Sequence, residues 1–332
     1  MDTPLLIVNP SSGSLRGSRA VARFGAAVER ALGDVDIELT QRRGHAVELA
    51  RHGAAAGRRT IVAVGGDGTL SEVVNGVMAA GASGGAGEPE PPAAPRVGLI
   101  GLGTGGDFGR GLGMGRRLGD HLAVIAAGHT RAVDLLHVAF RDHDGGPVER
   151  YVVNVLSAGP GSLVDRYVER LPGLVGGRLS YGLAAAWALV RTPRARLRLR
   201  LWDEPGGEAV AERELDTWVL GVCNGPVFGG GMRLAPGALV DDGLIDVVSI
   251  GPARRRTVAR YLPSVYRGRH VLVPGVEVLR CRALEVELLA PADPERFALD
   301  VDGDALGKLP LRARLVPGAL TVLAPPDAGA PR

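Results

Sequence analysis

The chain has 332 residues, about twice the length of a typical domain, which predicts two domains or one large one. Its 45% hydrophobic and 23% charged residues are ordinary for a globular protein and argue against an intrinsically disordered chain. The net charge is only +3, aromatic residues make up 4%, and no known nucleic-acid-binding module is recognisable, so DNA and RNA are not expected partners.

Residues 1–133 alternate short apolar runs with helical patterns, which predicts a parallel, doubly wound α/β domain. Strand and helix patterns take turns over 4–10, 18–32, 35–40, 45–57 and 60–66, beginning with a strand. The Gly/Pro/Glu-rich segment 81–95 has no periodicity and predicts an exposed loop before another strand at 96–103.

Residues 134–326 predict a mainly antiparallel β domain interrupted by one helix. Short apolar runs recur at 131–140, 151–159, 196–203, 217–225, 244–250, 283–290 and 319–325. Whether the last segment returns to the first domain stays open.

We predict a cytoplasmic protein. Cys223 and Cys281 lack metal-binding or redox spacing, which favours buried, inert thiols in a reducing compartment. The longest apolar stretch, 179–190, is shorter than the roughly 18 to 20 residues that cross a bilayer.

Arginines gather at three places, and two interpretations of them stand side by side. The clusters are 191–200, 254–256 and the pair Arg267 and Arg269. They fit solvated protein faces, and they equally fit peripheral contact with the inner membrane face.

A glycine-rich turn follows the predicted strand 61–64. It runs from Gly65 to Thr69 and leads into a helix that begins near Leu70. Glycine backbone N–H groups at a helix N-terminus form a phosphate site. Asp67 would repel phosphate unless a cation or a sugar hydroxyl intervenes, so it indicates Mg²⁺ or a nucleotide; the alternative is a plain turn with Asp67 as helix cap.

Two further turns with small residues, 9–13 and 101–111, also follow predicted strands. The carboxyl ends of parallel strands lie at one edge of a sheet, where such folds bind ligands. A Walker sequence is absent, and 101–106 fits a dinucleotide fingerprint only formally. Together the three turns predict phosphate handling at one edge of the sheet.

In the order and spacing of its motifs, the sequence resembles the diacylglycerol kinase catalytic family, which includes bacterial lipid kinases, sphingosine kinases and ceramide kinases. The motifs are 9–13, Thr40, 65–76, 103–110, 154–162, 223–248 and 301–304. The resemblance covers nearly the whole chain. It implies an α/β nucleotide domain followed by a β-sandwich domain, with the active site in the cleft between them.

The resemblance also implies roles for single residues. ATP would be held by Asn9, Pro10, Ser11, Ser12, Gly13, Thr40, Gly65, Gly66, Asp67, Gly68, Thr69, Leu70, Ser71, Glu72 and Thr104. Asp107 would lie near the transferred phosphoryl group and its metal. Asp242 and the carbonyl groups of Leu239 and Leu244 would bind a structural Mg²⁺, although a plain turn between strands explains the same residues.

Asp304 stands where the family has a glutamate that acts as general base, so Asp304 is the predicted base. Two more departures are Gly106 and Ser71, each at a position where asparagine is common in the family. The segment 169–191 resembles a helix near the lipid entrance, and ordinary core is the competing interpretation.

The predicted function is an ATP- and Mg²⁺-dependent lipid kinase that phosphorylates a hydroxyl of diacylglycerol or a sphingoid-like lipid. Two alternatives remain: a kinase of a soluble substrate that resembles the NAD kinases, and an inert lipid-binding regulatory protein. The sequence leaves a homodimer open.

Overall fold

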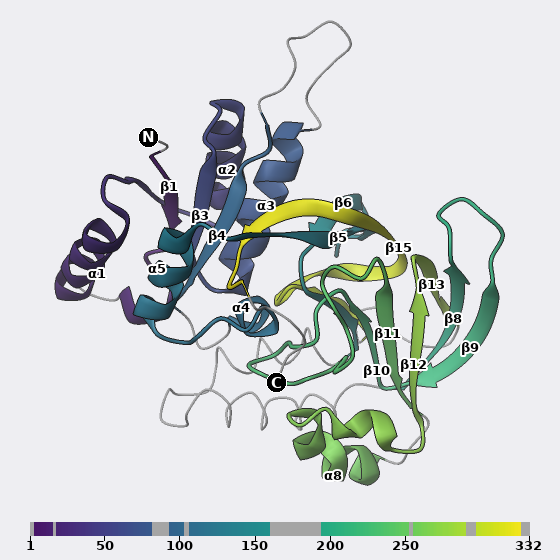
Figure 1. Ribbon diagram of the computed structural model, residues 1–332. Helices are drawn as coiled ribbons and strands as arrows, with labels where there is room; N and C mark the ends of the chain where they lie inside the picture. Colours follow the sequence, from purple (N-terminus) through teal and green to yellow (C-terminus); the bar gives the residue numbers. More distant parts are fainter. Residues whose placement is uncertain are drawn as a thin grey trace, which may run out of the picture. The chain divides into compact units, whose positions relative to one another are not determined.

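The computed structural model describes residues 3–15, 18–81, 93–102, 106–159, 194–251, 255–289 and 297–326 (Figure 1). The chain divides into two compact units. The first comprises Met1–Val133 and Gly318–Arg332, and the second comprises Asp134–Pro317. The chain passes from one unit to the other within two strands, β5 (Thr130–Arg141) and β15 (Asp304–Leu323).

The first unit is a parallel sheet in the order β2-β1-β3-β4, with the end of β15 beside β4. Its strands and helices, besides β5 and β15, are β1 (Leu5–Val8), η1 (Gly13–Leu15), α1 (Ser18–Leu32), β2 (Asp36–Leu39), α2 (His45–Ala55), β3 (Thr60–Gly65), α3 (Asp67–Gly81), β4 (Arg96–Gly101), α4 (Asp107–Gly111) and α5 (Leu118–Ala127). The predicted parallel α/β domain is confirmed.

Helices cover both faces of this sheet, with α1 and α5 on one side and α2 and α3 on the other (Figure 1). Every residue of β1 and β3 is buried, because side chains on both faces of these strands meet helices. Leu6, Val62 and Ile100 pack with Phe24 and Leu122 on the side of α1 and α5.

The second unit consists mainly of antiparallel strands, as predicted. Its strands and helices are β5, β6 (Pro147–Val152), β7 (Val155–Ala158), β8 (Ala195–Trp202), β9 (Ala211–Thr217), β10 (Val219–Cys223), β11 (Ile245–Ile250), α8 (Arg255–Val265), η2 (Arg269–Leu272), β12 (Val276–Cys281), β13 (Ala283–Leu289), β14 (Leu299–Val301) and most of β15. One path of paired strands runs β12-β11-β10-β7-β14-β15, and another runs from β15 through β13 and β8 to β9.

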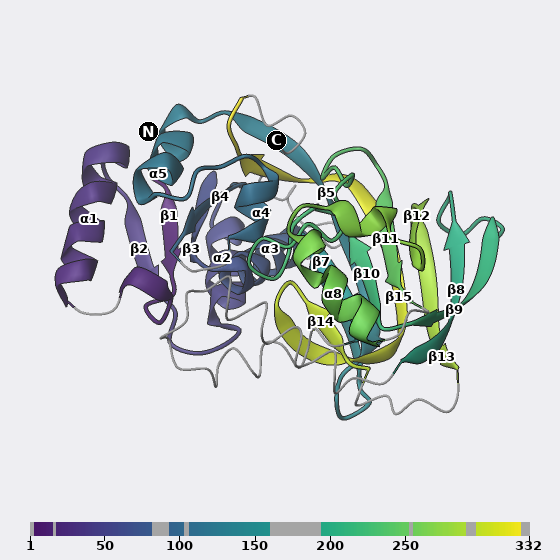
Figure 2. The same cartoon turned by 90° about the horizontal axis from the view of Figure 1, so that it is seen from below.

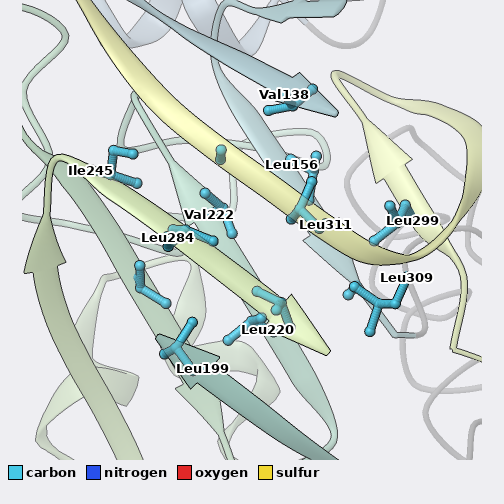
Figure 3. Packing of buried hydrophobic residues seen from close by; sticks show 14 of the residues in the cluster. Val138, Leu156, Leu199, Leu220, Val222, Ile245, Leu284, Leu299, Leu309 and Leu311 are labelled. Carbon is cyan, nitrogen blue, oxygen red and sulfur yellow. The ribbon is translucent and has the colours of Figure 1, made fainter. Parts of the chain in front are cut away.

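The core of the second unit is mainly aliphatic. Inward side chains of its strands meet in one cluster, including Leu156, Leu220, Leu284, Leu299 and Leu311 (Figure 3). Buried and outward residues alternate along β8, because successive side chains point to opposite faces, whereas every residue of β7 and β14 is buried.

Helix α8 and the following η2 lie outside the strands of the second unit (Figures 1 and 2). The arginine-rich segment that forms α8 was not predicted as a helix. The lipid-entrance segment 169–191 lies outside the described residues. Within the part of the chain that the structure describes, no helix combines the length and hydropathy needed to cross a membrane.

Candidate functional site

The order of strands in the first unit reverses between β1 and β3. From β1 the chain goes first to β2, at the edge of the sheet, and then crosses to β3 on the other side of β1. Doubly wound sheets bind ligands at such a switch point, beyond the carboxyl ends of the strands. Asn9 follows β1 here: its backbone N–H donates to the carbonyl of Val64 at 2.9 Å, and its Nδ2 lies 3.4 Å from Oγ1 of Thr69. The first two predicted turns therefore meet.

The turn after β3 is shaped by two glycines with different surroundings. A Cβ atom on Gly65 would lie 2.3 Å from Oγ1 of Thr69, so the buried threonine excludes any side chain there. A Cβ atom on Gly66 would meet no atom of the described residues within 4 Å. Helix α3 begins at Asp67, three positions before the predicted Leu70. The arrangement leaves open space beside the backbone at the N-terminal end of a helix, as a phosphate site requires.

Asp67 connects the second turn to the third. One carboxylate oxygen accepts hydrogen bonds from the backbone N–H groups of Gly106 (2.8 Å) and Asp107 (3.1 Å), and the other accepts one from Phe108 (3.3 Å). The carboxylate thus caps the first turn of α4. The sequence offered Asp67 as a cap for its own helix or as a sign of a cation; the structure shows it capping a different helix, 39 positions away.

Gly106 adopts the left-handed conformation, with φ 75° and ψ 38°, and no atom of the described residues lies within 4 Å of where a Cβ atom would be. Asparagine is one of the few other residues that tolerate this conformation, so this backbone accepts either residue. Asp107 is buried and pairs with Arg110 one turn along α4. Thr104 lies outside the described residues.

The predicted ATP residues of the first turn and Thr40 lie at the same edge of the parallel sheet, where β1 and β2 end. The backbone N–H of Ser11 donates to Oδ1 of Asn9 at 3.0 Å, which shapes the turn of Pro10, Ser12 and Gly13. The backbone N–H of Thr40 donates to the carbonyl of Val8 at 2.9 Å.

Glu72 is engaged with the protein. Its two oxygens accept hydrogen bonds from the backbone N–H groups of Gly44 (2.9 Å) and Ala46 (3.2 Å) at the start of α2. Leu70 and Ser71 are buried inside the first unit, and Gly68 is half-buried. Glu72 therefore holds the loop that follows Thr40 against α3.

In the second unit, Asp302 and Gly303 form a two-residue turn between β14 and β15, with φ values of 51° and 91°. Two positive φ values are typical of the tight turn that joins antiparallel strands. The buried Asp302 carboxylate accepts hydrogen bonds from the backbone N–H groups of Val153 (2.9 Å), Asn154 (3.0 Å) and Val155 (3.1 Å). Asp304, the predicted base, follows directly and is half-exposed.

The predicted metal loop runs from Leu239 to Leu244. The backbone N–H of Leu244 donates to Oδ1 of Asp242 at 3.2 Å. Burial raises the pKa of Asp242, and the carboxylates of Asp134 and Asp241 raise it further. The hydrogen bond from Leu244 and the charge of Arg280 lower this pKa. A carboxylate and backbone carbonyl groups are oxygen donors of the kind that a hard cation binds, and no group of three acidic, histidine or cysteine side chains gathers among the described residues.

Two residues around this loop were missed by sequence reasoning. Asp134 accepts a hydrogen bond from the backbone N–H of Gly243 at 2.9 Å. Arg280 donates to Oδ1 of Asp246 at 3.0 Å and lies 4.0 Å from Asp242. Both are distant in the sequence. The only signal in the sequence was the acidic run 241–246, because a carboxylate of this run that becomes buried needs a basic partner elsewhere in the chain.

Within the arginine cluster 191–200, the arginines on β8 form ion pairs with glutamates. Arg196, Arg198 and Arg200 alternate with buried leucines on β8, and each contacts a glutamate on β9 or β13. The nearest such contact, between Arg196 and Glu214, is 2.9 Å. These charges are neutralised by the protein itself, which favours the interpretation as a solvated face.

Comparison with known proteins agrees with both units. Residues 3–138 match the profile of the diacylglycerol kinase catalytic domain, and residues 154–324 match that of the YegS C-terminal NAD kinase beta sandwich-like domain. A diacylglycerol kinase of Staphylococcus haemolyticus is 27% identical, over 97% of this chain and 88% of its own length. A Chromohalobacter salexigens protein named for its likeness to the lipid kinase YegS is 30% identical, over 96% of this chain and 92% of its own.

Among solved structures, a diacylglycerol kinase from Bacillus anthracis has a similar fold, with a TM-score of 0.68. The similarity extends over 99% of this chain and 98% of the other, at 19% sequence identity. At that identity the likeness establishes the fold alone.

Proposed function

This chain belongs to the diacylglycerol kinase catalytic-domain family with a YegS-type C-terminal domain, and from that premise we propose that it is an ATP- and Mg²⁺-dependent lipid kinase. The acceptor is a hydroxyl of diacylglycerol or of a similar lipid, such as a sphingoid base. The protein visits the inner face of the membrane to reach it.

The observation that best supports the proposal is the joining of three glycine turns at the carboxyl edge of the parallel sheet. Asn9 contacts Thr69, and Asp67 accepts hydrogen bonds from the start of α4. These contacts fix the turns relative to one another before any ligand binds. A rigid set of backbone N–H groups is what a triphosphate needs, because the cost of ordering the loops has already been met within the fold.

In this proposal ATP occupies the turns at 9–13 and 65–72, with Thr40 and Thr104 beside it. The open backbone at Gly66 and the N-terminal end of α3 receive phosphate oxygens. Asp67 and Glu72 act as positioning residues, since their carboxylates bind backbone N–H groups of α4 and α2.

Asp107 would hold the metal ion that accompanies the transferred phosphoryl group, and its ion pair with Arg110 orients the carboxylate. Asp242, with the carbonyl groups of Leu239 and Leu244, would hold a structural Mg²⁺. When bound, the metal neutralises phosphate charge as the phosphoryl group leaves ATP.

Asp304 is the proposed general base, which takes the proton from the lipid hydroxyl as its oxygen attacks the γ-phosphorus. The turn before it is anchored by Asp302, so the backbone at Asp304 has a fixed position within the second unit. An aspartate is one methylene shorter than the family's glutamate, and the anchored turn limits how far it can move to compensate.

The experiment is transfer of labelled γ-phosphate from ATP and Mg²⁺ to diacylglycerol, sphingosine and ceramide in mixed micelles, with NAD as a soluble control. Labelled lipid phosphate is the expected product. Labelled NAD phosphate would replace the proposal with the soluble-substrate alternative. ATP binding without transfer to any acceptor would favour the inert lipid-binding protein.

A further inference from the structure

One surface segment of the second unit concentrates positive charge without acidic neighbours in sequence. Residues 251–276 contain six arginines and neither aspartate nor glutamate. Arg260, Arg267 and Arg269 are exposed, and none of the three forms an ion pair with another described residue. They differ in this respect from the arginines of β8, which glutamates neutralise.

The same segment exposes apolar side chains. Leu272, at the end of η2, is 81% exposed, the highest fraction among the large hydrophobic residues that the structure describes. Tyr261, on α8, is 38% exposed. A leucine this exposed contributes little to the core that the described residues form, and large exposed apolar side chains are typical of contact surfaces.

The segment is fixed to the rest of the second unit through its buried residues. The backbone N–H of Arg233 donates to the carbonyl of Val265 at 3.0 Å, and Nε2 of the buried His270 lies 2.9 Å from the carbonyl of Leu234. The exposed arginines and Leu272 therefore stand on a platform that is already folded, and binding to them requires little ordering of the backbone.

We propose that exposed side chains of this segment act together as a basic-apolar patch that docks the chain on an anionic lipid surface. The side chains are Arg260, Tyr261, Arg267, Arg269 and Leu272. The arginines attract the headgroups, while Leu272 and Tyr261 enter the boundary between headgroups and acyl chains. The inference rests on the proposed function only in choosing lipid over other polyanions. Exposed leucine beside arginine favours the same choice, because nucleic acid offers no apolar layer for it.

The test is sedimentation of the full chain with vesicles of phosphatidylcholine, with and without one-third phosphatidylglycerol, in the absence of ATP. Binding is expected only to the anionic vesicles, and it should weaken as salt is added. Replacing Arg260, Arg267 and Arg269 together by glutamine should weaken binding on the order of 100-fold.

The matched control replaces three exposed arginines of α1 and α2, Arg23, Arg30 and Arg51, by glutamine. The change in net charge is the same, so equal weakening in both variants would overturn the proposal and leave only a nonspecific charge effect. Because the assay involves no turnover, its result is independent of whether the chain is a kinase.

Leu272→Ala tests the apolar part and should reduce vesicle binding roughly tenfold at every salt concentration. Val210→Ala, at a site that is 57% exposed outside the patch, should leave binding unchanged. Unaltered binding by Leu272→Ala, or tighter binding of the native chain to RNA than to anionic vesicles, would refute docking on lipid.

Discussion

Replacing Asp302 by asparagine tests whether a buried carboxylate holds the turn that leads to Asp304. The native carboxylate accepts hydrogen bonds from three consecutive backbone N–H groups, at residues 153–155, at 2.9, 3.0 and 3.1 Å. Asparagine keeps the size of the side chain and tolerates the φ of 51°. It loses the charge, however, and one of its two polar atoms becomes a donor that faces a donor.

The expected loss in the free energy of unfolding is about 2–4 kcal/mol. A hydrogen bond to a charged group contributes about 1.5–3 kcal/mol, and a buried N–H left without an acceptor costs about 1–3 kcal/mol. Asp302 is 7% exposed, so water does not replace the lost acceptor. The asparagine oxygen retains part of the bonding, which keeps the total below the sum of these contributions.

Tryptophan fluorescence during urea unfolding measures this change, because Trp187, Trp202 and Trp218 all belong to the second unit. The matched control is Asp304→Asn, at a half-exposed position, where a change below about 1 kcal/mol is expected. An Asp302→Asn variant that unfolds at the same urea concentration as the native chain, or as the control, would refute the reasoning.

Three further predictions concern a glycine, the two cysteines and two buried histidines. Gly106→Asn should keep the free energy of unfolding within about 1 kcal/mol by circular dichroism, because the left-handed backbone and the open space accept asparagine; a larger loss contradicts this. Burial raises the pKa of Cys281 to about 12 and also raises that of Cys223, so both thiols should resist a thiol reagent at about pH 8 until the chain is denatured, and labelling of native protein would be the opposite result. Burial lowers the pKa of His121 and His270, so the folded state binds fewer protons than the unfolded state, and stability should fall as pH drops from about 6.5 through the folded pKa values. Urea midpoints at about pH 7.5 and about pH 5.5 test this for His270→Gln, which should show a smaller difference than the native chain.

The sequence predicted the edge where the glycine turns gather, because strand order along the chain fixes which ends of parallel strands lie together. It did not predict the partner of Asp67. The carboxylate reaches the start of α4, and this contact depends on how two neighbouring strands end rather than on local spacing. Asp302 was missed for the same reason, since its partners at residues 153–155 are far away in the chain.

Several elements of the second unit also went unpredicted, with a common physical cause. Among the described strands, β6, β9 and β12 each pair with a single neighbour and bury few side chains, so their sequences lack the apolar alternation of inner strands. Helix α8 contains Pro263 and several arginines, which concealed its helical pattern. Apolar periodicity identifies elements by what they bury, and these elements bury little.

The most direct test of the central claim is the rate of labelled phosphate transfer to lipid by Asp304→Asn, with ATP binding measured on the same samples. The exposed Asp203→Asn variant is the control for charge and expression. The account predicts transfer at least about 100-fold slower than in the native chain, with ATP binding retained. Transfer by Asp304→Asn at a rate close to that of the control would contradict it.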